Sequence, residues 1–320
     1  MKVSSFLSLL SILIMMSSCD DILEEDISSA KIQGIYPRDN DTVYGNTVNF
    51  SWEYINDTDD YRVQVFDENQ TYILDSLVNS INFTYSLNPG SYKWRVRGEN
   101  FAYYSPYSLP LKFTVTPSDD LNTQTVIQHT PSNGHFFNTT DITFTWGDLP
   151  AVDYYELEIS RINNGETTEY QESNIENTSL TIDESVINEE GKYTWKVRGV
   201  NETSGTVFSE RDFYIDTSSP SAPLLSSPDD QETFEVLNPT VIFNWQTVNN
   251  NSNYQSAVSY LIEVSSQENF SNIIFSEDTQ NTSIQFEFDD PGDYYWRVFS
   301  YDLAGNDGGY SIRRTFTIEE

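Results

Sequence analysis

Hydrophobic and polar residues alternate in short runs along most of this chain. Three runs share one pattern and end in tryptophan, at 48–52, 142–146 and 241–245. A period of two sends the apolar side chains to one face of a β-strand. Turn residues separate successive runs by roughly 8–15 residues, which is typical of an antiparallel β-sandwich. No stretch shows a convincing helical period, so the pattern predicts an all-β protein.

One phrase occurs three times and sets the number of domains. The segments 90–96, 191–197 and 292–298 all read Gly-x-Tyr-x-Trp-x-Val, and their glycines lie 101 residues apart both times. A spacing of that length is a domain repeat, because the units of a solenoid run to roughly 20–50 residues. The chain of 320 residues is therefore predicted to hold three modules of about 100 residues each.

The remaining alternating runs repeat in the same order, and each module opens with a proline turn. The other predicted strands are 61–65, 81–85 and 113–115, then 155–159, 180–182 and 213–215, then 260–264, 284–288 and 316–318. The six tryptophans, two in each module, fall at equivalent strand positions that point inward. We interpret them as core residues rather than a sugar-stacking platform, and truncation of one should cost about 3–5 kcal/mol.

The repeated strands resemble the fibronectin type III fold of the immunoglobulin-like group. In that family an early strand carries a buried tryptophan, as at the end of 48–52, and a later strand reads Tyr-x-Val-x-Val-x-Ala-x-Asn. Segments 92–100 and 193–201 follow this frame with Trp for the first Val, whereas the third copy departs at Ser300 and Asp302. The resemblance covers 33–318 and implies three tandem β-sandwiches, but it says little about function.

The repeats divide the chain into seven predicted segments. They are a signal peptide (1–18), a lipidated cysteine with an acidic tether (19–32), three fibronectin type III-like modules (33–116, 127–216 and 224–320) and two linkers (117–126 and 217–223). The first linker is polar and should flex, whereas the second carries two prolines and should be stiffer. Three modules end to end would make a rod on the order of 100 Å.

The N-terminus has the pattern of an export signal. Lys2 precedes an apolar run over 6–16 that is too short to span a bilayer. Cys19, the only cysteine, follows at once and has no partner for an internal disulfide. The segment Met-Ser-Ser-Cys resembles the lipobox of bacterial lipoproteins, which implies lipid attachment at Cys19. The alternative is an ordinary signal peptide with an incidental cysteine.

An acidic stretch at 20–26 follows Cys19. It resembles the stretch after the lipidated cysteine in Bacteroidetes lipoproteins that are sent to the outer face of the outer membrane. The resemblance implies exposure to the cell exterior, and attachment to the periplasmic leaflet is the alternative. Residues 20–31 are expected to form a disordered tether.

The charge balance excludes one class of partner. The chain has 16 Lys and Arg against 50 Asp and Glu, a formal net charge of −34. Such a surface repels phosphate backbones, so nucleic acid is not expected as a partner. The scarce cations gather on the outward positions of the Tyr-x-Trp strands, where cross-strand ion pairs with Glu156, Glu158 and Glu263 are expected.

The sequence contains no recognisable catalytic constellation, and no enzyme activity is predicted. The two histidines, His129 and His135, belong to no metal-binding pattern. Asp302, Asn306 and Asp307 could offer oxygens to Ca²⁺, but their spacing is not that of a known calcium loop, and such residues are also ordinary in tight turns. No cofactor is expected beyond this candidate calcium site.

The loop after the first Tyr-x-Trp strand departs from the repeat. It places Phe101, Tyr103, Tyr104 and Tyr107 close together, and neither other copy has such a cluster. Loops at the ends of a sandwich often carry binding residues, and exposed tyrosine suits both sugars and proteins. These four residues are the candidates for ligand binding, with local packing as the alternative.

The sequence favours a non-catalytic, lipid-anchored cell-surface protein that acts as a binding, adhesion or spacer stalk. Its expected partners are the membrane, through the lipid, and a protein or glycan ligand. The alternative is a glycan-binding lipoprotein of a polysaccharide-uptake system, and a polysaccharide-degrading enzyme is a distant third. The identity of the ligand and the oligomeric state do not follow from the sequence.

Overall fold

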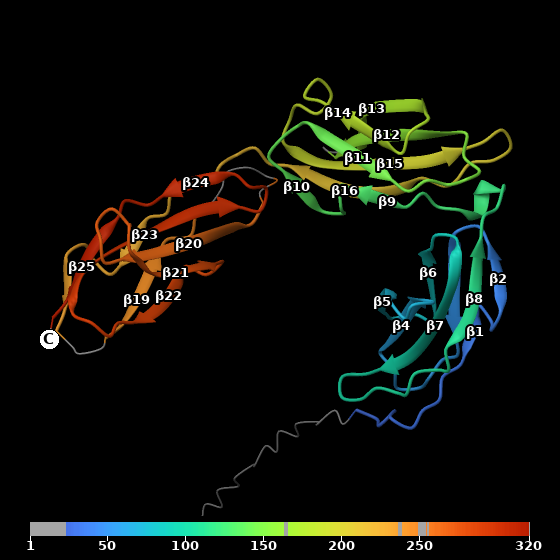
Figure 1. Cartoon of the computed structure of the whole chain (residues 1–320), viewed down its shortest axis with the longest axis horizontal. Coiled ribbons are helices and arrows are strands. Elements are labelled where there is room, and N and C mark those ends of the chain that lie inside the picture. The colour runs from blue at the N-terminus through green and yellow to red at the C-terminus, as the bar shows by residue number, and fades with distance from the viewer. Residues whose placement is uncertain (1–23, 163–165, 236–238, 249–253, 255, 320) are drawn as a thin grey trace, which may run out of the picture. The chain divides into compact units, whose positions relative to one another are not determined.

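The computed structural model describes residues 24–162, 166–235, 239–248, 254 and 256–319. Three β-sandwiches follow one another along the chain (Figure 1). The contacts divide the chain into two compact units, of which one holds the first sandwich and the other holds the second and third. No helix in the described part is long and apolar enough to cross a membrane.

The first module packs two sheets face to face. One sheet has the order β1 (Gly34–Tyr36), β3 (Thr47–Trp52) and β6 (Asn82–Ser86). The other has the order β2 (Asp41–Tyr44), β8 (Leu111–Thr116), β7 (Gly90–Glu99), β4 (Asp60–Asp67) and β5 (Tyr72–Val78).

The second module repeats this arrangement, after a short 3₁₀ helix at Leu121–Thr123. Its smaller sheet has the order β14 (Ser179–Ile182), β11 (Ile142–Trp146) and β9 (Gln128–Thr130). Its larger sheet has the order β10 (His135–Phe137), β16 (Ser209–Ile215), β15 (Gly191–Val200), β12 (Tyr154–Ile162) and β13 (Glu166–Ile175).

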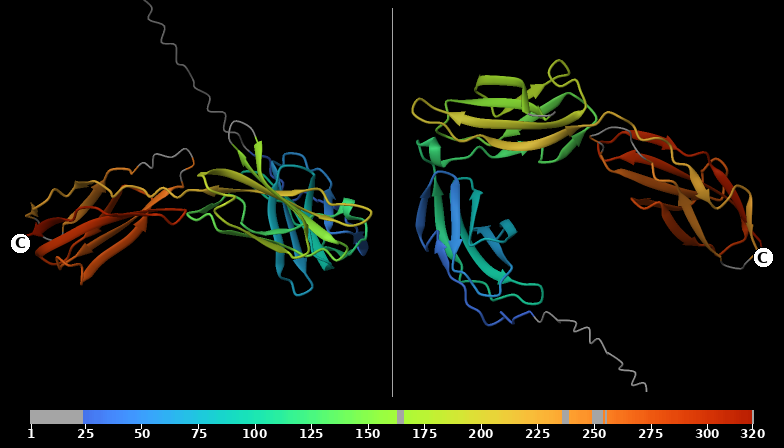
Figure 2. Two further views of the ribbon diagram at one scale, coloured as in Figure 1. Left: turned by 90° about the horizontal axis from the view of Figure 1, so that it is seen from above. Right: turned by 180° about the vertical axis from the view of Figure 1, so that it is seen from behind.

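The third module, orange to red in Figure 2, has the same two sheets with one added strand. Its smaller sheet has the order β17 (Leu225–Ser227), β19 (Thr240–Trp245) and β22 (Ser283–Glu287). Its larger sheet has the order β18 (Glu232–Phe234), β25 (Arg314–Ile318), β23 (Gly292–Asp302), β20 (Val258–Ser265) and β21 (Ile273–Thr279), and β24 (Asp307–Tyr310) pairs with β23.

The predicted class of tandem β-sandwiches is confirmed, but three sets of strands and β24 were not predicted; the sets are β1, β9 and β17, then β2, β10 and β18, then β5, β13 and β21. Each larger sheet contains an edge strand, β5, β13 or β21, that the sequence analysis left unassigned. In β5 no residue is fully buried, and Tyr72 and Ile73 are both exposed. Leu74 and Val78 of β5 pack partly against the core, but apolar residues also occupy the exposed positions, so the strand shows no clear period of two.

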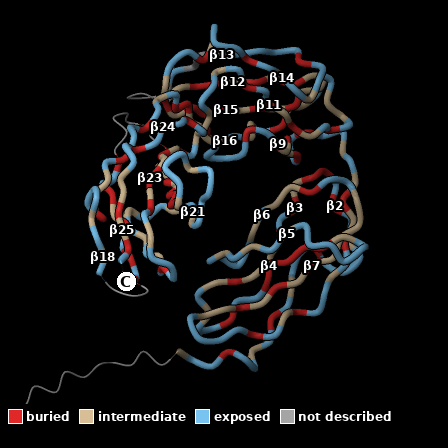
Figure 3. The backbone as a smooth tube through the Cα atoms, turned by 60° about the vertical axis from the view of Figure 1, so that its left-hand side comes forward, coloured by how far each residue is buried: buried red, intermediate tan, exposed pale blue. Residues whose placement is uncertain are grey.

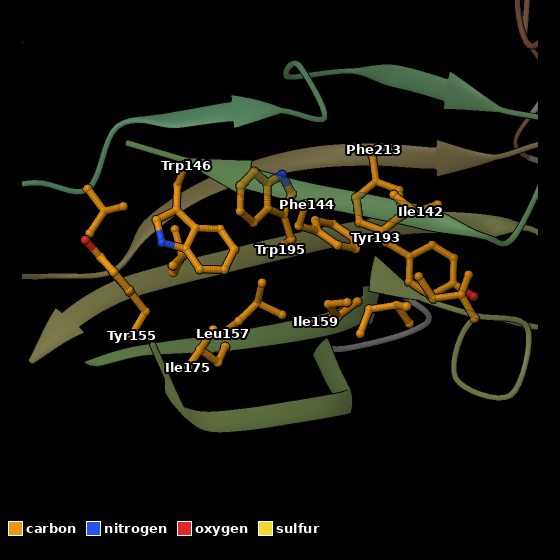
Figure 4. Close-up of a cluster of buried hydrophobic side chains, with 14 of the residues drawn as sticks. Ile142, Phe144, Trp146, Tyr155, Leu157, Ile159, Ile175, Tyr193, Trp195 and Phe213 are labelled. Carbon is orange, nitrogen blue, oxygen red and sulfur yellow. The ribbon is translucent and has the colours of Figure 1, made fainter. Parts of the chain in front are cut away.

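Each module has its own core, and all six tryptophans lie in these cores with at most 4% of their surface exposed. In the second module the ring of Phe144 lies 5.1 Å from that of Trp195, and Trp146 lies 6.5 Å from it (Figure 4). Buried residues alternate with less buried ones along the inner strands (Figure 3). The tryptophans are therefore core residues, as predicted.

Packing begins earlier in two modules than the predicted boundaries. Ile27 and Ile32 are buried although they lie in the predicted tether, and Ile32 belongs to the first core. Leu121 and Val126 are buried although they lie in the first predicted linker. An apolar residue near a sandwich is more stable against its core than in water. These lead segments, 24–32 and 119–126, therefore belong to their modules.

The expected ion pairs between neighbouring strands form. Arg198 lies 2.6 Å from Glu156, and Arg297 lies 2.7 Å from Glu263. Glu158 accepts a hydrogen bond from Gln171 of the edge strand. Partly exposed pairs of this kind contribute about 0.2–1 kcal/mol each.

Candidate functional site

The candidate loop follows β7 in the first module and is built on one asparagine. The backbone N–H of Asn100 donates to the carbonyl of Tyr103 at 2.9 Å. Its side-chain oxygen accepts from the N–H groups of Ala102 and Tyr103, at 3.2 and 2.8 Å. Asparagine favours such a turn because its short side chain reaches the backbone two and three residues further on.

The second module builds the same turn with different side chains. Asn201 donates to the carbonyl of Ser204 at 2.9 Å and accepts from the N–H groups of Thr203 and Ser204, at 3.1 and 2.8 Å. Residues 101–104 read Phe-Ala-Tyr-Tyr, whereas 202–205 read Glu-Thr-Ser-Gly. The backbone is thus common to both loops, and only the side chains distinguish the first module.

The aromatic side chains of this loop face solvent. Phe101 is 93% exposed, Tyr104 63% and Tyr103 39%. The guanidinium of Arg97 lies 4.5 Å from the ring centre of Tyr104, which fixes one side of that ring. Neighbouring exposed aromatic residues are unusual on a solvated surface and indicate a contact site.

Tyr107 differs from its three neighbours because the other modules have an equivalent. Arg95 and Arg97 lie 4.2 and 4.8 Å from its ring centre. The same stack recurs between Arg198 and Phe208 and between Arg297 and Tyr310. Burial is the main cause that raises the pKa of Tyr107. We therefore assign Tyr107 to the packing of the sheet, which was the alternative for the cluster.

The sheet beneath the loop carries a network of charges. Glu99 accepts hydrogen bonds from Arg62 at 2.6 Å and from Arg97 at 2.8 Å. Burial acts to raise the pKa of Glu99, but these two arginines outweigh it and the pKa is lowered. Hydrogen bonds from Arg62 to Glu99 and Asp75 raise the pKa of that guanidinium. The cations under the loop are thus held by protein carboxylates.

A hollow of about 460 Å³ lies beside the loop. Its lining includes Ile32, Leu109 and Leu111. Leu111 lies opposite Trp94 on the neighbouring strand. In the other modules Arg211 and Arg314 lie opposite the equivalent tryptophans. Each of these arginines also donates a hydrogen bond to the proline carbonyl of its module's opening turn. The exchange of arginine for leucine therefore adds an apolar side chain to the lining of the hollow in the first module. Sequence reasoning missed this difference, although an alignment of the last strands contains it.

Asn100 also joins the loop to the start of the module. Its side-chain N–H₂ donates to the carbonyls of Glu25 and Asp57, both at 3.0 Å. Figure 1 shows the first described residues, in blue, beside the loop that follows β7. The aromatic loop therefore lies at the pole where the chain enters the module.

The other modules repeat this link, which we call the asparagine clamp (Asn100, Asn201 and Asn306). Asn201 donates to the carbonyl of Asp119 at 2.9 Å, and Asn306 donates to that of Asp216 at 2.7 Å. The sequence signal was the asparagine that ends the frame at 92–100 and 193–201. The third copy was read as a departure because its asparagine follows four residues later.

The candidate calcium residues take part in this clamp. Asp302 is 2% exposed, and both of its oxygens accept hydrogen bonds from Asn306, at 2.8 and 3.0 Å. Asp307 is exposed at the start of β24. In the described residues no three His, Cys, Asp or Glu side chains come together in a way that could hold a metal ion. We assign Asp302 and Asn306 a structural role.

Cys19, the predicted site of lipid attachment, lies outside the described residues. Its distance from the first module along the chain is nevertheless set by the sequence. Glu25, whose carbonyl the clamp holds, is the sixth residue after Cys19.

Comparisons with solved structures found similar proteins, including three that are each less than 25% identical to this chain. The chain is similar to the FN1–FN3 domains of chicken CNTN1, with 14% identity, a TM-score of 0.44 and coverage of 91% of this chain and 98% of that one. It is also similar to fibronectin(III)-like modules of Clostridium thermocellum CbhA, with 16% identity, a TM-score of 0.37 and coverage of 60% and 92%.

A third similar structure holds the three N-terminal domains of the bacteriophage RB49 Highly Immunogenic Outer Capsid protein (Hoc). It is 17% identical, with a TM-score of 0.34 and coverage of 91% of this chain and 98% of that one. No protein family and no curated protein matches the chain.

Proposed function

We propose that this chain is a non-catalytic, lipid-anchored surface protein whose three sandwiches form a binding or spacer stalk. One observation carries the proposal: the lipobox-like segment 16–19 leads, within a few residues, into three β-sandwiches that follow one another along the chain. The modules repeat the same cores, clamps and arginine–aromatic stacks, which suits a protein that holds a site at a distance.

The anchor is tested at Cys19. Cells that express the full chain are labelled with a palmitate analogue and fractionated. The wild-type protein is expected in the membrane fraction with label, and a Cys19→Ala variant is expected to lose both. Ser8→Ala, in the apolar run, is the matched control and should keep them. A Cys19→Ala protein that stays membrane-bound and labelled would contradict the anchor.

We further propose that the anchored protein sits in the outer membrane and faces the cell exterior. The acidic stretch at 20–26 supports this side. Protease added to intact cells should digest the modules. Digestion only after the outer membrane is permeabilised would place them on the periplasmic side instead.

Glycan binding is the second candidate function, and the exposed rings of Phe101, Tyr103 and Tyr104 favour it. Glycan-array binding by the purified protein is the test. The matched variant replaces 101–104 with Glu-Thr-Ser-Gly from the second module, which has the same backbone turn. Binding that the replacement abolishes would support a glycan site at this loop, and binding that survives it would reject the site.

A further inference from the structure

The exposed aromatic loop lies at the end of the first module to which the proposed anchor is attached. Asn100 holds the carbonyl of Glu25 at 3.0 Å, and the loop residues 101–104 follow it directly. Six residues from Cys19 to Glu25 can span about 22 Å at most. A lipid on Cys19 would therefore keep this pole within about that distance of the bilayer surface.

A second exposed aromatic residue belongs to the same pole. The clamp also holds the carbonyl of Asp57, in the loop between β3 and β4, and this loop carries Tyr54, which is 64% exposed. The pole thus carries Phe101, Tyr104 and Tyr54, each at least 63% exposed. Aromatic residues with an apolar body and a polar tip are enriched where protein meets the headgroup region.

The other modules provide an internal comparison. The equivalent loop of the second module reads Glu-Thr-Ser-Gly, and Asp148 stands where the first module has Tyr54. In the third module the corresponding loop, 303–308, has no aromatic residue. Only the first module adjoins the proposed anchor, and the loops equivalent to 101–104 in the other two modules, 202–205 and 303–308, have no aromatic residue.

We propose that loop 101–104, together with Tyr54, docks into the headgroup region of the bilayer that holds the lipid. This inference rests on the proposed anchor at Cys19, and the side chains of Phe101 and Tyr104 make the contact. The docked pole positions the first module against the membrane and leaves the second and third modules to carry any ligand site.

The acidic residues at the pole favour a bilayer with neutral rather than anionic headgroups. Glu24, Glu25 and Asp26 lie in the lead segment beside the loop, and anionic headgroups repel carboxylates within a Debye length. The contact should therefore be stronger on phosphatidylcholine than on membranes rich in phosphatidylglycerol, and salt should reduce the difference.

The first test uses a tryptophan reporter on vesicles. Cys19 is the only cysteine, so residues 19–320 are coupled through it to a maleimide lipid in phosphatidylcholine vesicles that contain brominated lipid. In a Phe101→Trp variant the added tryptophan should be quenched about twofold or more, because the headgroup region would surround it. The native tryptophans are buried and give a constant background.

The matched control is Glu202→Trp, which places the reporter at the same position of the same turn in the second module. It should stay unquenched. Equal emission from both reporters with and without brominated lipid would overturn the proposal. Glycan binding by the anchored protein with an unquenched reporter at position 101 would also overturn it and assign the loop to a glycan.

The second test asks whether the aromatic side chains, rather than the short tether, hold the pole at the membrane. A Tyr54→Trp reporter is compared in the native chain and in a chain whose residues 101–104 are replaced by Glu-Thr-Ser-Gly. Quenching should fall towards the level of the Glu202→Trp control after the replacement. Unchanged quenching would overturn the assigned role of the loop.

Because the protein is coupled chemically through Cys19, failure of the docking can be distinguished from failure of the proposed lipid anchor. A chain that cells fail to lipidate would still dock when it is coupled through Cys19, so that failure would refute the anchor alone. A chain that cells lipidate but that leaves both reporters unquenched on vesicles would refute the docking alone.

Discussion

At the scale of single residues, aromatic side chains divide into two groups with opposite roles. The repeated tryptophans lie inside the sandwiches, and Trp94 also donates its indole N–H to the carbonyl of Pro37 at 2.9 Å. Phe101, seven residues further along the chain, is 93% exposed. The same residue class therefore stabilises the fold at one position and is free to make contacts at the other.

Replacement of these two residues should separate the roles. Trp94→Ala removes a fully buried ring and should lower the free energy of unfolding of the first module by about 3–5 kcal/mol. Phe101→Ala should change it by less than about 0.5 kcal/mol, because the ring touches mainly water. Urea unfolding followed by circular dichroism measures both. Comparable losses from the two variants would mean that the ring of Phe101 packs into the module.

At the scale of elements, each sandwich is joined to the segment that precedes it by the asparagine clamp. In the first module the clamp fixes the lead segment 24–32 against the loops at one pole. Ile27 and Ile32 are buried in the same segment. The clamp and the buried isoleucines therefore hold the residues from Glu25 onward against the module.

Loss of the clamp should loosen the lead segment. Asn100→Ala removes two donated and two accepted hydrogen bonds. Backbone amides in 27–32 should then exchange with solvent faster, by roughly the factor of ten that corresponds to 1–1.5 kcal/mol. Asn201→Ala, the matched control, should speed exchange near Leu121 and leave 27–32 unchanged. Exchange in 27–32 that Asn100→Ala leaves unaltered would mean that the buried isoleucines suffice.

Acid should weaken the sheet of the first module through Glu99. Its pKa in the folded state is lowered from 4.5 because Arg62 and Arg97 donate to it, although burial opposes them. A lowered pKa contributes stability above the unfolded value, and this contribution is lost as pH falls through the folded value.

The measurement for Glu99 is urea unfolding of the native chain and of Glu99→Gln at several pH values. At pH 7 the native chain should be the more stable. The difference should shrink as pH falls below about 4.5, the range in which the unfolded state takes up the proton first. A difference that is the same at pH 7 and at pH 3 would show that the charge of Glu99 contributes nothing.

At the scale of the whole molecule, the chain is three cores in series on a strongly acidic surface. The buried residues form three separate clusters, one in each module. The net charge of −34 opposes compaction through self-repulsion, which salt screens.

Calorimetry should resolve this modular construction. Trp94→Ala should lower the midpoint of the heat-absorption peak of the first module and leave the peaks of the others in place, because the cores share no buried residue. Added sodium chloride should raise the midpoints in general. A single peak that moves as a whole in the Trp94→Ala variant would show that the modules unfold as one unit.

The sequence by itself determined the class of fold, the number of modules and the identity of the core. This follows because alternation is a local property: every second residue of a strand faces the same side, and the phrase around Trp94 recurs twice. The edge strands were not predictable in this way, since β5 has apolar residues at both buried and exposed positions and its place depends on hydrogen bonds to β4.

Only the tertiary structure decided the nature of the candidate site. Phe101 and Glu25 are far apart in sequence, and the hydrogen bond from Asn100 brings their segments together. The sequence grouped Tyr107 with the loop cluster. In the structure its ring stacks on Arg95 and Arg97, as the equivalent aromatic residues of the other modules stack on arginine. Contacts between distant segments depend on how the sheets pack, and no local pattern records them.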